Sequence, residues 1–238
     1  MMAFNNASGH IGNSASNMQL SALCASKGSQ KWIQKLVNEN QDMLDTEIKR
    51  ALHLPDAERV EWRSPLEREG YAEYRDAAFL EKLGIDPGEV RLERYWPKGG
   101  PRWDALGRTS SGKLLLVEAK SHIPELISTL KAESDKSKSL ISSSLKEAKA
   151  YWGSNGDFDW SKTFYQYANR LAHLYLLRDV NAPAYLVFVY FLNDLEMGGP
   201  STVDEWKGAI KLLHKCLGVR ERRLEKCVAD VFIDINKI

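Results

Sequence analysis

The chain has 238 residues, 43% of them hydrophobic, and a formal net charge of +1 at pH 7. This size favours one domain with a sizeable core and appendages, and the balanced charge excludes a strong overall field for a polyanionic partner, so any basic surface must be local. The three widely spaced cysteines fit neither a disulfide framework nor a zinc site, and the longest apolar run, residues 184–192, is too short to span a bilayer. We therefore expect a soluble cytoplasmic protein without a membrane partner.

The N-terminal residues 1–28 are rich in Asn, Ser and Gly and hold a single charged residue, Lys27. They lack the basic start and the apolar core of a signal peptide, so we interpret them as a flexible tail. From residue 29 to about residue 53, apolar residues recur at helical spacing, which predicts one long amphipathic helix or two shorter ones. This helical appendage would begin the folded domain, residues 29–238, and it leaves a homodimer contact open.

Two short elements are expected next. Residues 60–65 read as an extended piece that Pro65 ends, and residues 71–83 read as a helix followed by Gly84, a good C-terminal cap. The apolar stripe of this helix also carries Glu73 and Asp76, and charged residues on an inward stripe need a reason. Either they pair with a nearby arginine at the edge of the core, or they belong to a functional site.

Residues 89–96 alternate apolar with charged side chains, which predicts a half-exposed strand. The following Gly-rich segment, residues 97–101, is either a simple connection or a loop that touches a phosphate backbone, and we favour the connection.

The stretch RWDALGRTSSGKLLLVEAK, residues 102–120, contains two strand-forming runs around Ser110-Ser111-Gly112. A three-residue hairpin loop with a left-handed Gly112 suits this sequence. In that register Asp104 lies directly opposite Glu118 on one face of the sheet, and Lys120, two residues further on, points the same way. A slip of one residue would destroy the arrangement.

Two carboxylates and an amine on one sheet face are costly if they are buried without partners. Carboxylates are the oxygen ligands that Mg²⁺ prefers, and substrate phosphate usually completes its shell. Lys120 would then orient or help deprotonate an attacking water and offset developing phosphate charge. The alternative is a surface hairpin with an ordinary Glu–Lys pair, but the apolar residues 114–117 predict a buried strand that delivers Glu118 and Lys120 to the rim of the core. His122 continues the alternation and either borders this site or is an ordinary polar rim residue.

The remaining chain alternates helices with strands. Pro124 suits the first turn of a helix that extends to about residue 152, although the charged run at residues 131–138 can break it. Residues 163–178 form a clearer helix, with Gln166 and Arg170 one turn apart beside its apolar face. The guanidinium of Arg170 is by its own chemistry a reasonable phosphate contact. The continuous β-branched and aromatic run at residues 182–192 predicts a central strand buried on both faces.

A last helix is expected from residue 202 to residue 217, followed by a strand at residues 228–235. Between Lys207 and Lys226 there are seven Lys or Arg residues against two acids. This locally basic tract is explained equally well by the solvated face of a helix. The order of elements predicts an α/β sandwich with a mixed central sheet flanked by helices. The sequence contains no Walker loop, dinucleotide glycine motif, Gly-x-Ser-x-Gly elbow or HExxH.

In these features the sequence resembles the PD-(D/E)XK nuclease superfamily, whose motif is an acid on one strand, a hairpin, and acid-x-Lys on the next strand. Asp104 matches the first acid, Glu118 the second and Lys120 the lysine. Trp103 stands where the name-giving proline would be, a departure that many members share. The motif lies within residues 102–120, and the order of elements extends the resemblance to most of the chain. The resemblance implies a restriction-endonuclease-like fold.

The resemblance also implies a metal-dependent nuclease that hydrolyses phosphodiester bonds, in DNA by preference. Asp104 and Glu118 would bind Mg²⁺, with Mn²⁺ as a substitute, and Lys120 would position the water. Because removing one charge from a like-charged acidic pair relieves repulsion, the sequence suggests that changes at Glu118 or Lys120 leave the fold largely intact. The alternatives are a catalytically silent nucleic-acid-binding or assembly protein of the same fold, and a hydrolase of smaller phosphate esters.

Two further sets of residues follow from the resemblance alone. A helix before the sheet often supplies one more acid in this superfamily; Glu73 is the first choice, with Asp76 and Glu69 as alternatives. Some exonuclease-like branches place a Gln and, four residues on, a Tyr on the helix after the catalytic strands. Gln166 matches that Gln, whereas Arg170 replaces the Tyr.

Overall fold

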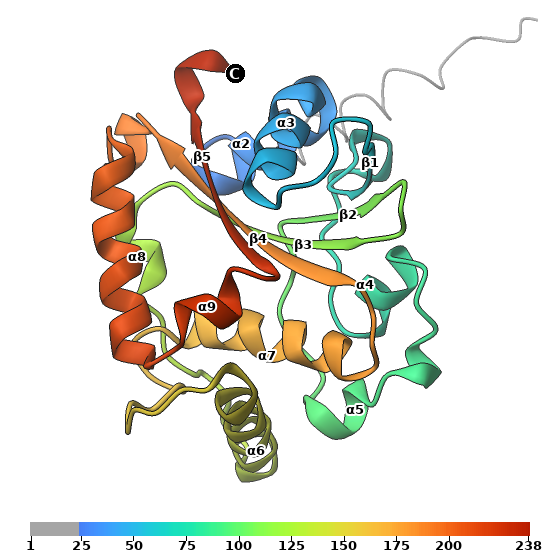
Figure 1. Ribbon diagram of the computed structural model, residues 1–238, viewed down its shortest axis with the longest axis vertical. Coiled ribbons are helices and arrows are strands. Elements are labelled where there is room, and N and C mark those ends of the chain that lie inside the picture. Colours follow the sequence, from blue (N-terminus) through green and yellow to red (C-terminus); the bar gives the residue numbers. More distant parts are fainter. Residues whose placement is uncertain (1–23) are drawn as a thin grey trace, which may run out of the picture.

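The computed structural model describes residues 24–238, so nearly all of the predicted tail lies outside the described residues. The chain forms a five-stranded mixed sheet between helices (Figure 1). The antiparallel pairings β1–β2 and β2–β3 are followed by the parallel pairings β3–β4 and β4–β5. The predicted α/β class with a mixed, helix-flanked sheet is confirmed. The strands, which lie side by side in chain order, are β1 (Val60–Ser64), β2 (Ala105–Thr109), β3 (Leu114–Lys120), β4 (Ala184–Leu192) and β5 (Val228–Asp234).

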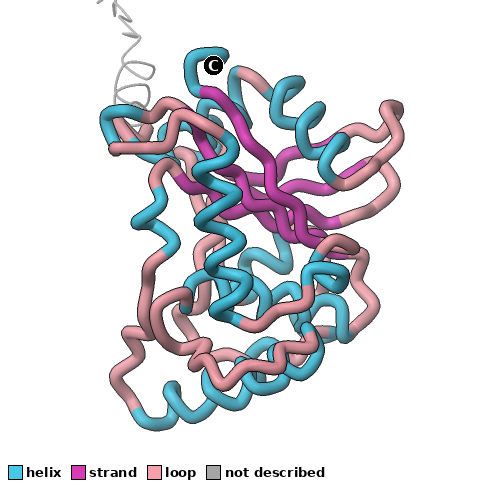
Figure 2. The backbone as a smooth tube through the Cα atoms, turned by 60° about the vertical axis from the view of Figure 1, so that its left-hand side comes forward, coloured by secondary structure: helices cyan, strands magenta, loops and turns pink. Residues whose placement is uncertain are grey.

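Helices cover both faces of this sheet, and the strands run between the helical layers in Figure 2. On one face, α2 (Gly28–Glu39) and α3 (Gln41–Ala51) pack on a core that includes Leu115 and Val117 of β3. On the other face, Leu114 and Leu116 join a larger core, to which the remaining helices contribute. These helices are α4 (Ala77–Lys82), α5 (Leu92–Tyr95), α6 (Asp135–Trp152), α7 (Tyr165–Asp179), α8 (Val203–Leu217) and α9 (Glu221–Leu224). Strand β3 is therefore buried on both sides.

The N-terminal helical region consists of two helices, because Asn40 interrupts the helical conformation between them. The helix predicted for residues 71–83 is wrong in its first half, since α4 begins only at Ala77. Tyr71 and Asp76 adopt positive φ angles of 58° and 54°, which cannot continue a right-handed helix. Glu73 consequently lies in a non-helical segment, where the next residue, Tyr74, forms an isolated antiparallel bridge with Trp103.

The strand predicted for residues 89–96 is also wrong. The one-turn 3-10 helix Pro87–Glu89 ends where this segment begins, and the segment itself contains the short helix α5. Its buried side chains, Val90, Leu92, Tyr95 and Trp96, follow one another at one-, two- and three-residue steps rather than in strict alternation. The alternation of apolar and charged residues therefore predicted the wrong element, because a single helical turn can present the same apolar residues to the core.

The other elements agree with the sequence within a few residues. The long helix expected from Pro124 is an exception, because residues 127–134 are not helical and separate the 3-10 helix Ile123–Leu126 from α6. Ser134 caps α6 by accepting a hydrogen bond from the Ser137 N–H. Thr202 and Glu205 form a capping box that starts α8. None of the helices in residues 24–238 combines the length and the hydropathy that crossing a bilayer requires. Three further 3-10 turns span Glu67–Glu69, Leu195–Met197 and Ile235–Lys237.

Candidate active site

The β2–β3 hairpin has the register that the sequence predicts. Gly112 adopts a φ of 87°, and the Thr109 N–H donates a 2.8 Å hydrogen bond to the Lys113 carbonyl across the loop. The ladder ends with Ala105 paired to Val117. One residue beyond it, Asp104 stands opposite Glu118, so the hairpin brings the two predicted acids to the same end of the sheet.

Asp104 is tied to the partner strand through its side chain. Its Oδ2 accepts a 2.7 Å hydrogen bond from the Ala119 N–H. Burial and, secondarily, the negative charge of Glu118 raise the pKa of Asp104 to about 8, against the lowering effect of Lys120, the Ala119 N–H and Arg170. Near neutral pH this carboxyl group is held largely protonated, and a bound cation would favour its ionised form.

Glu118 lies at the centre of a buried ion network. Its side chain is 1% exposed, and those of its two cationic partners, Lys120 and Arg170, are 7% and 4% exposed. Lys120 Nζ lies 2.5 Å from Glu118 Oε1, and Arg170 Nε lies 2.6 Å from Glu118 Oε2. Burial acts to raise the pKa of Glu118, but the charges of Arg170 and Lys120 outweigh it and lower that pKa. Glu118 is therefore ionised, and both of its oxygens are already engaged.

Helix α7 supplies two side chains to this network. Gln166 Oε1 accepts a 3.0 Å hydrogen bond from Lys120 Nζ, so this candidate residue lies against the predicted lysine. One turn later, Arg170 donates a 2.8 Å hydrogen bond to the Arg102 carbonyl, and its guanidinium lies 4.8 Å from the centre of the Trp103 ring. The pairing of Arg170 with Glu118 was not predicted. The position of Arg170 four residues after Gln166 indicates only that the two side chains share one face of the helix.

Of the three candidate upstream acids, Glu73 alone is electrostatically coupled to the site. Its pKa is raised mainly by burial, with a contribution from the charge of Glu118, and its Oε1 accepts a 3.0 Å hydrogen bond from Gln30. Asp76 instead accepts hydrogen bonds from the N–H groups of residues 99 and 100, which fixes the Gly-rich loop. Glu69 forms a 2.6 Å salt bridge with Lys82.

His122 lies beyond the end of β3 rather than within the ion network. Its Nε2 is 3.3 Å from Glu125 Oε1, and the second oxygen of Glu125 accepts a hydrogen bond from Ser29.

A different acid, Asp230, lies in the same row of the sheet as Glu118: Glu118 pairs with Phe188, and Phe188 pairs with Asp230. Burial raises the pKa of Asp230 to about 7. Asp230 was not among the predicted site residues. It lies at a partly buried position of β5, between the buried Ala229 and Val231.

Within residues 24–238, no group of three or more His, Cys, Asp and Glu side chains is arranged to hold a metal ion. The two opposed carboxylates, Asp104 and Glu118, nevertheless suit Mg²⁺, which proteins often bind through one or two carboxylates with water and phosphate as the other ligands.

Comparison of the chain with protein-family models, curated proteins and solved structures gave no significant match.

The substitution Asp104→Asn is expected to stabilise the folded chain increasingly as the pH rises. The folded-state pKa of about 8 lies above the value of about 3.9 expected for an unfolded chain, so wild type loses stability as the pH rises from about 4 to about 8. Asparagine removes this loss and still offers an oxygen to the Ala119 N–H. The gain should be near zero at pH 4 and exceed about 1 kcal/mol at pH 7, where thermal unfolding without divalent ions measures it.

Added Mg²⁺ should raise the melting temperature of wild type and reduce its difference from Asp104→Asn, because a ligand that binds only the folded state stabilises it. A wild type that is indifferent to Mg²⁺, together with an Asp104→Asn variant of lower stability, would mean that the carboxylates serve the fold and would refute the metal site that the resemblance implies.

Proposed function

We propose that this chain is a metal-dependent nuclease of the PD-(D/E)XK type with a restriction-endonuclease-like fold, and that it hydrolyses phosphodiester bonds in DNA. The observation that supports this proposal is the convergence of Asp104, Glu118 and Lys120 at one end of the mixed sheet, with Gln166 of α7 against the lysine. These residues come from three separate elements. A local Glu–Lys surface pair would need neither the opposed Asp104 nor burial beneath α7.

Asp104 and Glu118 are the residues that would hold Mg²⁺ or Mn²⁺. A bound divalent ion supplies charge stabilisation at the phosphate and lowers the pKa of a bound water. The charge of Glu118 contributes to the raised pKa of Glu73, and for this reason we include Glu73 as an assisting acid of the site. Its raised pKa fits a carboxylate that gains most from a nearby cation.

Lys120 has the geometry of a positioning group. Its ammonium is held by Glu118 on one side and by the Gln166 side-chain oxygen on the other, so its third proton is the one free to contact water or a phosphate oxygen. A fixed donor of this kind stabilises charge that develops in the transition state without needing to reorganise.

Arg170 supports the alternative function. Its contact with Glu118 neutralises the second acid from within the protein, and the resulting network is almost fully buried. A catalytically silent nucleic-acid-binding or assembly protein would keep such a network to stabilise the fold. In the nuclease, by contrast, the Arg170 or Lys120 contact must open for Glu118 to reach a cation.

Incubation with supercoiled, linear and single-stranded DNA in Mn²⁺ or Mg²⁺ tests the proposal. We expect conversion of at least one substrate, no conversion in EDTA, and none by Asp104→Asn, which keeps the shape of the side chain. The exposed pair-forming acid Glu61 provides a matched control, because Glu61→Gln should cleave like wild type. Absence of cleavage together with absence of cation binding by calorimetry would favour the silent protein, and turnover of only small phosphate esters would favour a phosphatase-like hydrolase.

A further inference from the structure

A row of basic side chains follows α8 and continues into α9. Lys207, Lys211 and Lys215 are spaced four residues apart, so they lie on one face of the helix with a rise of about 6 Å between neighbours. All three are exposed, whereas the opposite face of α8 is buried in the core through Trp206, Ile210, Leu213 and Leu217. The packing of α8 therefore does not depend on the lysines.

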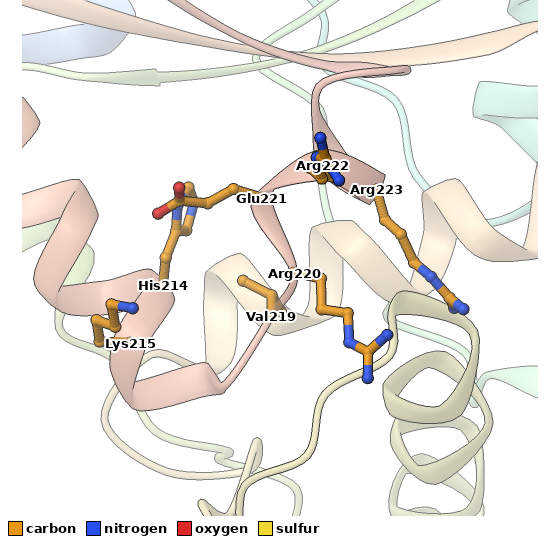
Figure 3. A pocket seen from close by; sticks show the side chains of 7 residues that line it. All are labelled: His214, Lys215, Val219, Arg220, Glu221, Arg222 and Arg223. Atoms are coloured by element: carbon orange, nitrogen blue, oxygen red, sulfur yellow. The ribbon is translucent and has the colours of Figure 1, made fainter.

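Two adjoining cavities lie along this row. The first, of about 480 Å³, is lined by Lys215 of α8 and by Arg220, Arg222 and Arg223 around α9. Figure 3 shows Lys215 on one side of this cavity and Arg220 and Arg223 on the other, with Val219 between them. The second cavity, of about 360 Å³, is lined by Lys207 and Lys211 and shares His214 and Glu221 with the first. We call the two cavities together the basic groove.

The cations of the basic groove are not neutralised by the fold. Within residues 24–238, none of the seven Lys and Arg side chains between Lys207 and Lys226 takes part in a salt bridge. The acids that also line the groove are Glu221, Glu225 and Asp230. Six Lys and Arg side chains therefore line the groove against three acids, which leaves an excess of positive charge there. Such a local excess attracts anions.

We propose that the basic groove binds the phosphate backbone of a nucleic acid. The three lysines of α8 span about 12 Å along the helix, and the α9 arginines extend the row further. A backbone that carries one phosphate about every 3.4 Å along each strand can engage the whole row, whereas a compact anion would reach one end of it. The groove lies beside β5, separated from Glu118 on β3 by β4, so it forms a second contact with nucleic acid. This inference rests on the proposed nuclease function and gives that function a substrate-holding surface.

The test compares two triple variants for binding to a labelled 30-base-pair DNA duplex in EDTA. The groove variant is Lys211→Gln/Lys215→Gln/Arg222→Gln. The control, Lys131→Gln/Lys138→Gln/Lys146→Gln, removes the same charge from exposed positions on and before α6. We expect the groove variant to bind at least about 10-fold more weakly at low salt, and the slope of log K against log salt to fall by about 2 to 3. The control should stay within about twofold of wild type in affinity.

Equal weakening of both variants would show a general charge effect and would overturn the proposed binding groove. The proposal would also be overturned if the groove variant bound like wild type, or if wild type did not bind the duplex. Far-ultraviolet circular dichroism and melting of the groove variant confirm that it is folded. Binding is measured without metal, and cleavage is not needed for it. Cleavage by wild type with an unaffected groove variant would refute the groove alone, whereas groove-dependent binding without any cleavage would refute the nuclease alone.

Discussion

Replacing Glu118 by alanine is expected to abolish metal-dependent cleavage and to lower the free energy of unfolding by about 3 to 5 kcal/mol. The loss of cleavage follows from the loss of the candidate metal ligand. The loss of stability follows because Lys120 and Arg170 would remain buried with no carboxylate between them. The sequence alone suggested that such a change would leave the fold largely intact, and the two ion pairs reverse that expectation.

Urea unfolding at constant pH measures the change in the free energy of unfolding, and plasmid cleavage measures the loss of activity. The double variant Glu118→Ala/Arg170→Ala serves as the control, because removing one stranded cation should restore part of the stability without restoring cleavage. Full stability of Glu118→Ala would show that the buried ion network contributes nothing, and retained cleavage would remove Glu118 from the site.

The substitution Lys120→Ala is expected to lower the cleavage rate by roughly 10²-fold or more while cation binding persists. Lys120 is not a candidate metal ligand, and Glu118 keeps its contact with Arg170 when the lysine is gone. Loss of the ammonium removes the group that would position water and stabilise developing charge. Calorimetric titration with Mg²⁺ and single-turnover cleavage separate the two effects.

Lys113→Ala provides a matched comparison, since Lys113 flanks the same strand at its other end and contacts Glu58 at 3.6 Å. This variant should cleave like wild type. If both lysine variants cleave equally fast, Lys120 has no role in the reaction; if Lys120→Ala fails to bind Mg²⁺, its role is to shape the site rather than to act on water.

The sequence by itself determined the elements whose cause is local. The hairpin register follows from Gly112 and from the alternation of β3, and it sets Asp104 opposite Glu118 wherever the hairpin packs. The continuous apolar run of β4 and the heptad-like apolar spacing of α8 carried enough pattern to be recognised in the same way. The same local reasoning failed at residues 71–76 and 89–96, where short irregular segments have too few residues for a period to show.

Only the tertiary structure decided how the site is neutralised. Arg170 lies 52 residues beyond Glu118 in the chain, and no local pattern shows that α7 directs its guanidinium at that carboxylate. The non-helical placement of Glu73 likewise depends on the bridge between Tyr74 and Trp103. The raised pKa of Asp104 also depends on the tertiary structure, because burial of this carboxyl group is its largest cause. Residue types and spacing identify which groups can carry charge, but packing sets which of those charges are paired, exposed or suppressed.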